Sequence, residues 1–321
     1  MTKAGCPLDT PTYYFPSDDM ATLDLATGVS TPAKAERARC NSKVGLLIEG
    51  AANEPVVAIR ARAAVRDTDL QANCLRYLAE TGFKGIANGL SWSQAREATY
   101  YWSRIIVENT AERIYWWDDQ AALDGAPQVL SAAPDAAFPL SDPASPGGGK
   151  PSPWQVREWQ AVAGDAVASG LGAHLTVVDE DGYPLPMRAM SLERTEEGFR
   201  LQMPKGVPWT LGGPACLTFA GYFTFVGTAR SDDSICAIDV ERSLPEHPST
   251  KDAREVLQPS PDTLSNSMKR LEYEVERRGQ SIPVVPESEP APTRLAMLRQ
   301  QRLASDAPIT GLSEEQGNRS S

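Results

Sequence analysis

A short stretch of the chain, residues 28–50, combines residue types that suit the binding of a phosphate group. Ser30 or Thr31 is placed to cap a helix. Pro32 suits the first helical position, and Lys34 falls in the first turn. Free backbone N–H groups, the helix dipole and the ammonium charge would act together on a dianion. The pattern predicts a phosphate site at this helix start, with a plain cap and a solvated lysine as the alternative.

Metal and thiol chemistry have little support in the residue counts. The chain has 5 Cys without a Cys-x-x-Cys pair, and only 2 His. An odd number of scattered cysteines does not suit a disulfide framework, and two histidines cannot build a multi-histidine metal site. His174 begins an expected strand, so we expect it to have a structural role. The sequence therefore predicts neither a metal centre nor a catalytic thiol.

The charge balance excludes some classes of partner. Lys and Arg total 31 against 42 Asp and Glu, which gives a formal net charge of −11. This excess argues against electrostatic binding to nucleic acid or to an anionic membrane. No apolar run approaches the roughly 20 residues of a membrane span, and the first residues lack a signal-peptide core. We expect a soluble cytoplasmic protein whose partner is a small-molecule substrate.

The length and the Pro/Gly distribution predict two domains. A chain of 321 residues exceeds one typical domain, and a Pro/Gly-rich stretch interrupts it at residues 131–153. We expect a first domain over residues 1–130 and a second over 154–245. The remaining tail, residues 246–321, is expected to be largely disordered with two short helices, at 262–278 and 293–303. The first of these helices is expected to cover the second domain, with docking on a partner as the alternative.

Both domains are expected to be mainly β with few helices. In the first, residues 43–49 and 56–66 read as an antiparallel pair, 68–80 and 91–101 as helices, and 104–117 as two strands broken near Asn109. In the second, residues 173–193 read as a hairpin with its turn at Asp181-Gly182, and three further strands follow. A short internal repeat, KVGLLIEG against PACLTFAG, suggests that the two halves are related.

The sequence resembles a known protein family. Thr31, Lys34, Asn41, the run Ala61-Arg62-Ala63 and the strands at 104–117 look like the pyridoxamine 5'-phosphate oxidase family, whose fold is the FMN-binding split β-barrel. The second half is similar through the turn at 181–184, Arg188 and the run at 227–229. The resemblance covers roughly residues 13–117 and 154–240. It implies two antiparallel split barrels in one chain, as a monomeric pseudo-dimer or a homodimer, with a flavin at the interface.

The resemblance also implies roles for single residues. Thr31 and Lys34 match positions that hold the FMN phosphate, with Ser30 beside them, and Arg188 matches an arginine that reaches the same phosphate. Arg62 lies in the family-like run and is expected either to meet an anionic ligand or to lie on a solvated strand face. Val56 replaces a glutamine of the family.

Each half also lacks a phosphate-binding feature that the other half has. The first domain has no obvious equivalent of Arg188, and the second has no helix equivalent to the one that carries Lys34. We therefore expect one composite site between the halves, or else two decayed half-sites that bind no flavin.

Two functions of different classes follow. The first is an FMN-dependent oxidoreductase acting on an unidentified small molecule, in which the cofactor performs the electron transfer. A deazaflavin (coenzyme F420) or haem could replace FMN on this fold. The second is a non-catalytic ligand-binding or scaffold protein with decayed cofactor sites, because a fold alone does not imply activity.

Overall fold

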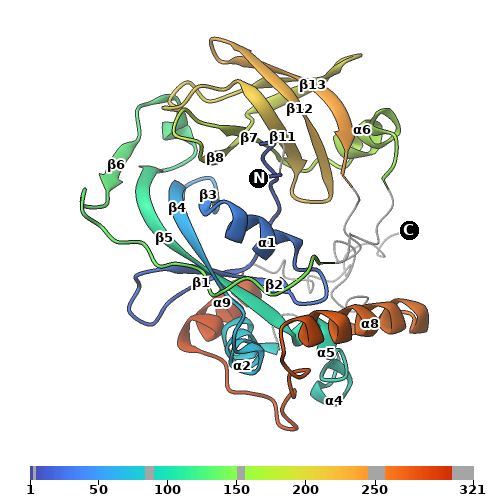
Figure 1. The fold of residues 1–321 in the computed structure, drawn as a ribbon. Helices are drawn as coiled ribbons and strands as arrows, with labels where there is room; N and C mark the ends of the chain where they lie inside the picture. Colours follow the sequence, from blue (N-terminus) through green and yellow to red (C-terminus); the bar gives the residue numbers. More distant parts are fainter. Residues whose placement is uncertain (3–4, 84–89, 150–155, 245–256, 306–321) are drawn as a thin grey trace, which may run out of the picture.

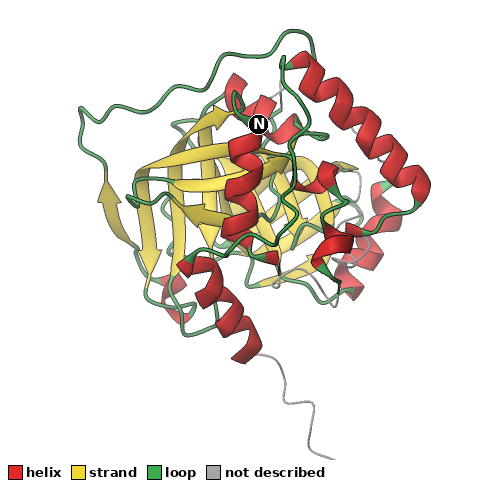
Figure 2. Cartoon of the chain, turned by 90° about the horizontal axis from the view of Figure 1, so that it is seen from below, coloured by secondary structure: helices red, strands yellow, loops and turns green. Residues whose placement is uncertain are grey.

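The computed structural model describes residues 1–2, 5–83, 90–149, 156–244 and 257–305, and within them the chain is mainly β (Figure 1). Two antiparallel sheets are present, one from each half of the chain. Figure 2 shows the strands gathered in the middle of the molecule, with helices around them. No helix in these ranges is long and apolar enough to cross a membrane.

The first half forms a sheet that curves into a half-barrel (Figure 1). Its strand order is β1-β2-β5-β4-β3, and β6 pairs with β5. The strands are β1 (Tyr14–Pro16), β2 (Leu23–Gly28), β3 (Lys43–Ile48), β4 (Val56–Arg66), β5 (Arg104–Trp117) and β6 (Gln128–Ser131). The helices are α1 (Ala33–Cys40), α2 (Leu70–Thr81), α4 (Trp92–Ala95), α5 (Thr99–Trp102) and the 3-10 helix η1 (Ala121–Asp124). The expected β3–β4 pair is confirmed.

Strand β5 corrects one expectation. Residues 104–117 form a single strand and do not break near Asn109, which is paired with Ala63 of β4. The irregularity lies further on, where Arg60 pairs with Arg113 and Ala61 with Ala111, so Glu112 is the extra residue of a bulge. Asn109 is tolerated inside the strand because its side-chain amide is bonded to backbone carbonyls.

The second half forms a seven-stranded sheet in the order β8-β7-β11-β12-β13-β10-β9. Helix α6 (Trp159–Ala168) precedes β7 (Ala173–Val178), β8 (Pro184–Arg188), β9 (Ser191–Arg194), β10 (Gly198–Gln202), β11 (Gly213–Phe219), β12 (Phe223–Asp232) and β13 (Ile235–Ser243). The expected hairpin turn is confirmed between β7 and β8, where Gly182 has φ 83°. A positive φ of this kind favours glycine, which explains the turn signal in the sequence.

The two halves share one hydrophobic core. Val56 and Trp117 of the first sheet pack in the same cluster as Leu185 and Trp209 of the second half. The edge strand β3 also lies against β8, and a methyl group added to Gly45 would overlap the backbone carbonyl of Pro184. The halves therefore share an apolar cluster, and glycine allows the close approach of β3 and β8.

The linker and the tail are packed on the first half. Within residues 132–149, Ser141 accepts a hydrogen bond from the Val65 N–H at 3.0 Å. Helices α8 (Pro261–Arg277) and α9 (Arg294–Ser305) match the two expected helices. However, α8 covers the first half and not the second as expected, because Leu271 and Val275 join the core formed by α1 and the first sheet. Residues 150–155, 245–256 and 306–321 lie outside the described ranges.

Candidate functional site

A cavity of about 460 Å³ lies at the junction of the two halves. Its volume falls within the range of small-molecule sites, roughly 300–1,000 Å³. The first half contributes an apolar wall from the inner face of the half-barrel, including Leu23, Leu25 and Val107. The second half contributes His174, Pro184, Pro186 and Thr218. The N-terminal segment, residues 8–12, also lines the cavity, and Figure 1 shows the N-terminus between the two sheets.

Helix α1 presents two cations to this cavity. Lys34, Arg37, Ala38 and Asn41 all line it, and their spacing places them on one face of the helix. Glu36 and Arg39 face the other way and bond to residues of α8 and the β4–α2 turn. Within the described ranges, neither Lys34 nor Arg37 has an ion-pair partner within 4.0 Å. The cavity therefore has a positively charged end.

The ionisation of these cations reflects their surroundings. Burial, together with the neighbouring Arg37 charge, lowers the pKa of Lys34 to about 8, while Asp9 acts in the opposite direction. Burial also lowers the pKa of Arg37, which stays protonated in the physiological range. A bound anion would offset both effects by supplying the missing opposite charge. Such an environment favours a phosphate or carboxylate group at this end of the cavity.

The N-terminal segment contributes the acidic residue Asp9. The Thr176 hydroxyl on β7 donates to Asp9 Oδ2 at 3.3 Å. Burial raises the pKa of Asp9, whereas the charges of His174 and Lys34 oppose that rise. Asp9 therefore lies between the cations of α1 and the second half, where its carboxylate partly offsets the positive charge.

A second polar group lies at the edge of the cavity. His174 Nε2 and Glu49 Oε2 are 2.6 Å apart, and both residues line the cavity. Arg188, on the strand paired with β7, approaches the same Glu49 oxygen at 3.9 Å but does not line the cavity. His174 thus has a place at the candidate site that the sequence did not indicate, and Arg188 is held beside it by Glu49.

The start of α1 differs from the expectation. The capping position is Pro32, without a side-chain cap, so neither Ser30 nor Thr31 caps the helix. The Ser30 carbonyl accepts a hydrogen bond from Arg270 Nε of α8 at 2.9 Å, and this packing covers the helix start. Neither Ser30 nor Thr31 lines the cavity. Of the three residues predicted to bind phosphate at this helix start, only Lys34 lines the cavity, because the side of α1 that carries Lys34 and Arg37 borders it.

Arg62 is engaged elsewhere in the interface. Its Nε donates to Glu112 Oε2 at 2.9 Å, and its guanidinium lies over the Tyr183 ring at 5.5 Å from the centroid. Tyr183, from the β7–β8 turn, donates its hydroxyl proton to the same Glu112 oxygen. The charge of Arg62 is therefore balanced within the contact between the halves, outside the cavity lining.

Thiol and metal chemistry remain without support among the described residues. No group of three His, Cys, Asp or Glu side chains there is placed to hold a metal ion. All five cysteines are free, and burial raises the pKa of Cys74 to about 11, which keeps that thiol protonated.

Neither family models nor curated protein sequences give a match to this chain.

Proposed function

We propose that the chain binds FMN in the cavity between its halves, as a pseudo-dimer of two split barrels, and acts as an oxidoreductase on a small molecule. The observation that carries the proposal is the pair of cations Lys34 and Arg37 at one end of a largely apolar cavity, where neither has an ion-pair partner within 4.0 Å among the described residues. A guanidinium fork and an ammonium charge suit a phosphate dianion.

The rest of the cavity suits a largely apolar ligand body. Leu25 and Val107 belong to the hydrophobic core of the half-barrel and line the cavity together with Val44 and Leu46 of β3. Burial of an aromatic ring against such a surface is favourable at roughly 25 cal/mol per Å². In this proposal the first half supplies Lys34 to the cavity and the second half supplies His174.

Bound FMN would supply hydride and electron transfer, and the chain would supply binding and proton handling. Lys34 and Arg37 hold the phosphate, and the apolar wall excludes water from the ring. The short contact between His174 Nε2 and Glu49 Oε2 can hold a proton at the cavity edge. Its position makes this pair the candidate for exchanging a proton with a substrate.

FMN affinity is expected to fall about tenfold between pH 7 and pH 9. Lys34 binds the phosphate only when protonated, and its pKa in the ligand-free chain is about 8. Affinity is therefore highest below that pH and declines above it, while the phosphate is a dianion throughout because its second pKa is about 6. Fluorescence titration with FMN at both pH values measures the change.

The matched variants are Lys34→Arg and Lys34→Ala. The arginine variant stays charged at pH 9 and should lose most of the pH dependence. The alanine variant should have a low FMN affinity at both pH values. Its affinity should be about 10-fold or more below that of the wild type at pH 7, which is the scale of a charge-assisted hydrogen bond. If the alanine variant bound FMN with wild-type affinity, the phosphate would not bind at this end of the cavity.

A second candidate is a ligand-binding protein without catalysis. The observation that favours it is that Arg188 and Arg62 are already balanced by Glu49 and Glu112, which leaves the cations of α1 as the main anion ligands. This candidate predicts that FMN binds but is not reduced by nicotinamide nucleotides. A deazaflavin or haem is the alternative cofactor for the same cavity.

A further inference from the structure

Asn109 is a buried polar residue in the apolar wall of the cavity. It lies on β5, where alternation places it on the same face as Ile105 and Val107, and its exposed fraction is 2%. It lines the cavity together with Leu23 and Val107. A polar side chain at such a position is expected to form hydrogen bonds, because burial without them is costly.

The amide nitrogen of Asn109 has hydrogen-bond partners. Nδ2 donates to the Leu23 carbonyl at 2.8 Å and to the Val107 carbonyl at 2.9 Å. Because both neighbours are acceptors, they fix which end of the amide is the nitrogen. Oδ1 therefore points away from them. It is buried and has no hydrogen-bond partner among the described residues.

An unpaired buried acceptor costs about 1–3 kcal/mol, and it gains most from a donor supplied by a ligand. Asn109 places this acceptor in the apolar wall of the cavity, and helix α1 provides cations for an anionic group. The complementary ligand has an anionic end and an apolar body that carries an N–H donor.

We propose that Asn109 is a specificity-determining residue whose Oδ1 accepts a hydrogen bond from a ring N–H of the bound cofactor. This inference rests on the proposed function and deepens it. Flavins and deazaflavins carry an imide N–H at the edge of the ring system, whereas the edge of haem offers no N–H donor. Asn109 therefore selects a flavin-type ring over haem.

The test compares FMN with FMN methylated at the imide nitrogen, which lacks the donor. The wild-type chain should bind FMN about 10- to 100-fold more tightly than the methylated compound, since an unmade hydrogen bond to a buried acceptor costs about 1–3 kcal/mol. Asn109→Leu has similar size and no acceptor, so it should bind the two compounds nearly equally. If bulk alone caused the discrimination, the leucine variant would retain it, and that result would overturn the inference.

A control variant on the same strand is Thr110→Val. The Thr110 hydroxyl is also buried and has no hydrogen-bond partner in the described part of the chain, but the residue does not line the cavity, so this variant should discriminate as the wild type does. Equal binding of both compounds to the wild type would refute the role of Asn109 and leave the FMN proposal standing. Failure of the wild type to bind FMN at all would overturn both proposals. The ligand comparison on the wild type needs no variant to fold.

Discussion

Replacing Arg60 with alanine is expected to lower the free energy of unfolding by about 3–5 kcal/mol, the cost of leaving a buried charge without its partner. Arg60 lies on β4 and is 9% exposed. Its Nη2 is 2.6 Å from Asp179 Oδ2, and its Nη1 donates to Asp181 Oδ2 at 2.6 Å. Both aspartates belong to the connection between β7 and β8, so this one side chain joins the two halves.

Asp179 is the reason why the expected loss of stability is large. Its side chain is 2% exposed, and its Oδ1 accepts the Tyr183 N–H at 2.8 Å, so the carboxylate cannot turn toward water. Without Arg60, a buried negative charge would remain in the interface. Urea denaturation of the Arg60→Ala variant measures the effect as a shift in midpoint.

Arg230→Ala is the matched control. Arg230 is also paired with an aspartate, Asp239 at 2.5 Å, but its side chain is 70% exposed and the pair lies within the second sheet. Exposed ion pairs contribute about 0–1 kcal/mol, so this variant should unfold nearly as the wild type does. A similar small effect for Arg60→Ala would mean that the ion pair does not hold the halves together.

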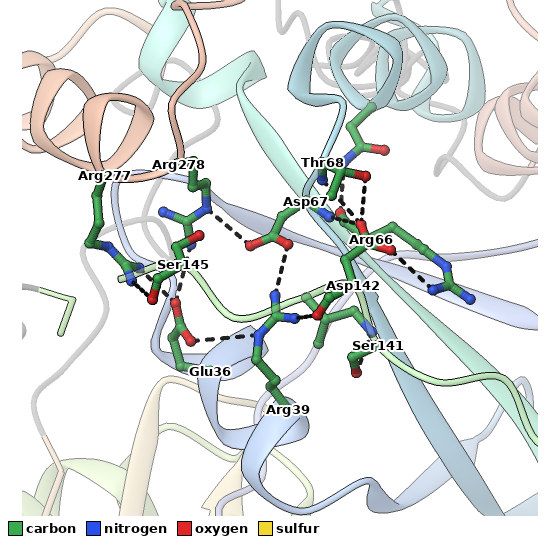
Figure 3. A network of polar contacts seen from close by, with 12 residues as sticks. Glu36, Arg39, Arg66, Asp67, Thr68, Ser141, Asp142, Ser145, Arg277 and Arg278 are labelled. Carbon is green, nitrogen blue, oxygen red and sulfur yellow. Dashed lines mark hydrogen bonds and ion pairs between the residues drawn. The ribbon is translucent and has the colours of Figure 1, made fainter. Parts of the chain in front are cut away.

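Replacing Arg278 with alanine is expected to destabilise the chain by a comparable amount, about 3–5 kcal/mol. Arg278 follows α8 and its side chain is 1% exposed. It contacts Glu274 at 2.5 Å, Asp67 at 3.1 Å and Glu36 at 3.2 Å. Figure 3 shows Arg277 and Arg278 directed at Glu36 and Asp67, with Arg39 on the far side. The cluster fixes α8 against α1 and the β4–α2 turn.

The same cluster bears on the cavity, because it anchors the face of α1 opposite Lys34 and Arg37. Loss of Arg278 should therefore also weaken FMN binding at temperatures where the chain is still folded. The control on α8 is Lys269→Ala, an exposed residue whose removal should change stability by no more than about 0.5 kcal/mol. If thermal denaturation showed equal midpoints for both variants, the anchoring role of Arg278 would be contradicted.

Local patterns predicted much of the fold. The turn at Asp181-Gly182, the β3–β4 pair and the amphipathic helix over 262–278 follow from short-range spacing, and all three are present. The sequence did not show which half of the molecule α8 covers. The apolar stripe that contains Leu271 shows only that one face of the helix is buried. Asn109 was taken for a strand break because asparagine is a poor strand former, and contacts to Leu23 far along the chain override that preference.

The site was predictable only in part. Lys34 was singled out by its helix position, and Arg37, three residues later, could have been found from the same helical face. Asp9 and His174 could not, because they meet the cavity through contacts between segments more than a hundred residues apart, such as the hydrogen bond from Thr176 to Asp9. Ser30 and Thr31 were misassigned as caps because the helix begins later, at Ala33 after Pro32, and the Ser30 carbonyl instead accepts a hydrogen bond from Arg270 of α8.

The most direct measurement is a crystal structure of the full chain grown with saturating FMN. We expect the phosphate on Lys34 and Arg37, the ring against Leu25 and Val107, and the ring N–H on Asn109 Oδ1. A flavin bound outside this cavity, or no bound flavin at saturation, would contradict the proposal that the junction of the two halves is a cofactor site.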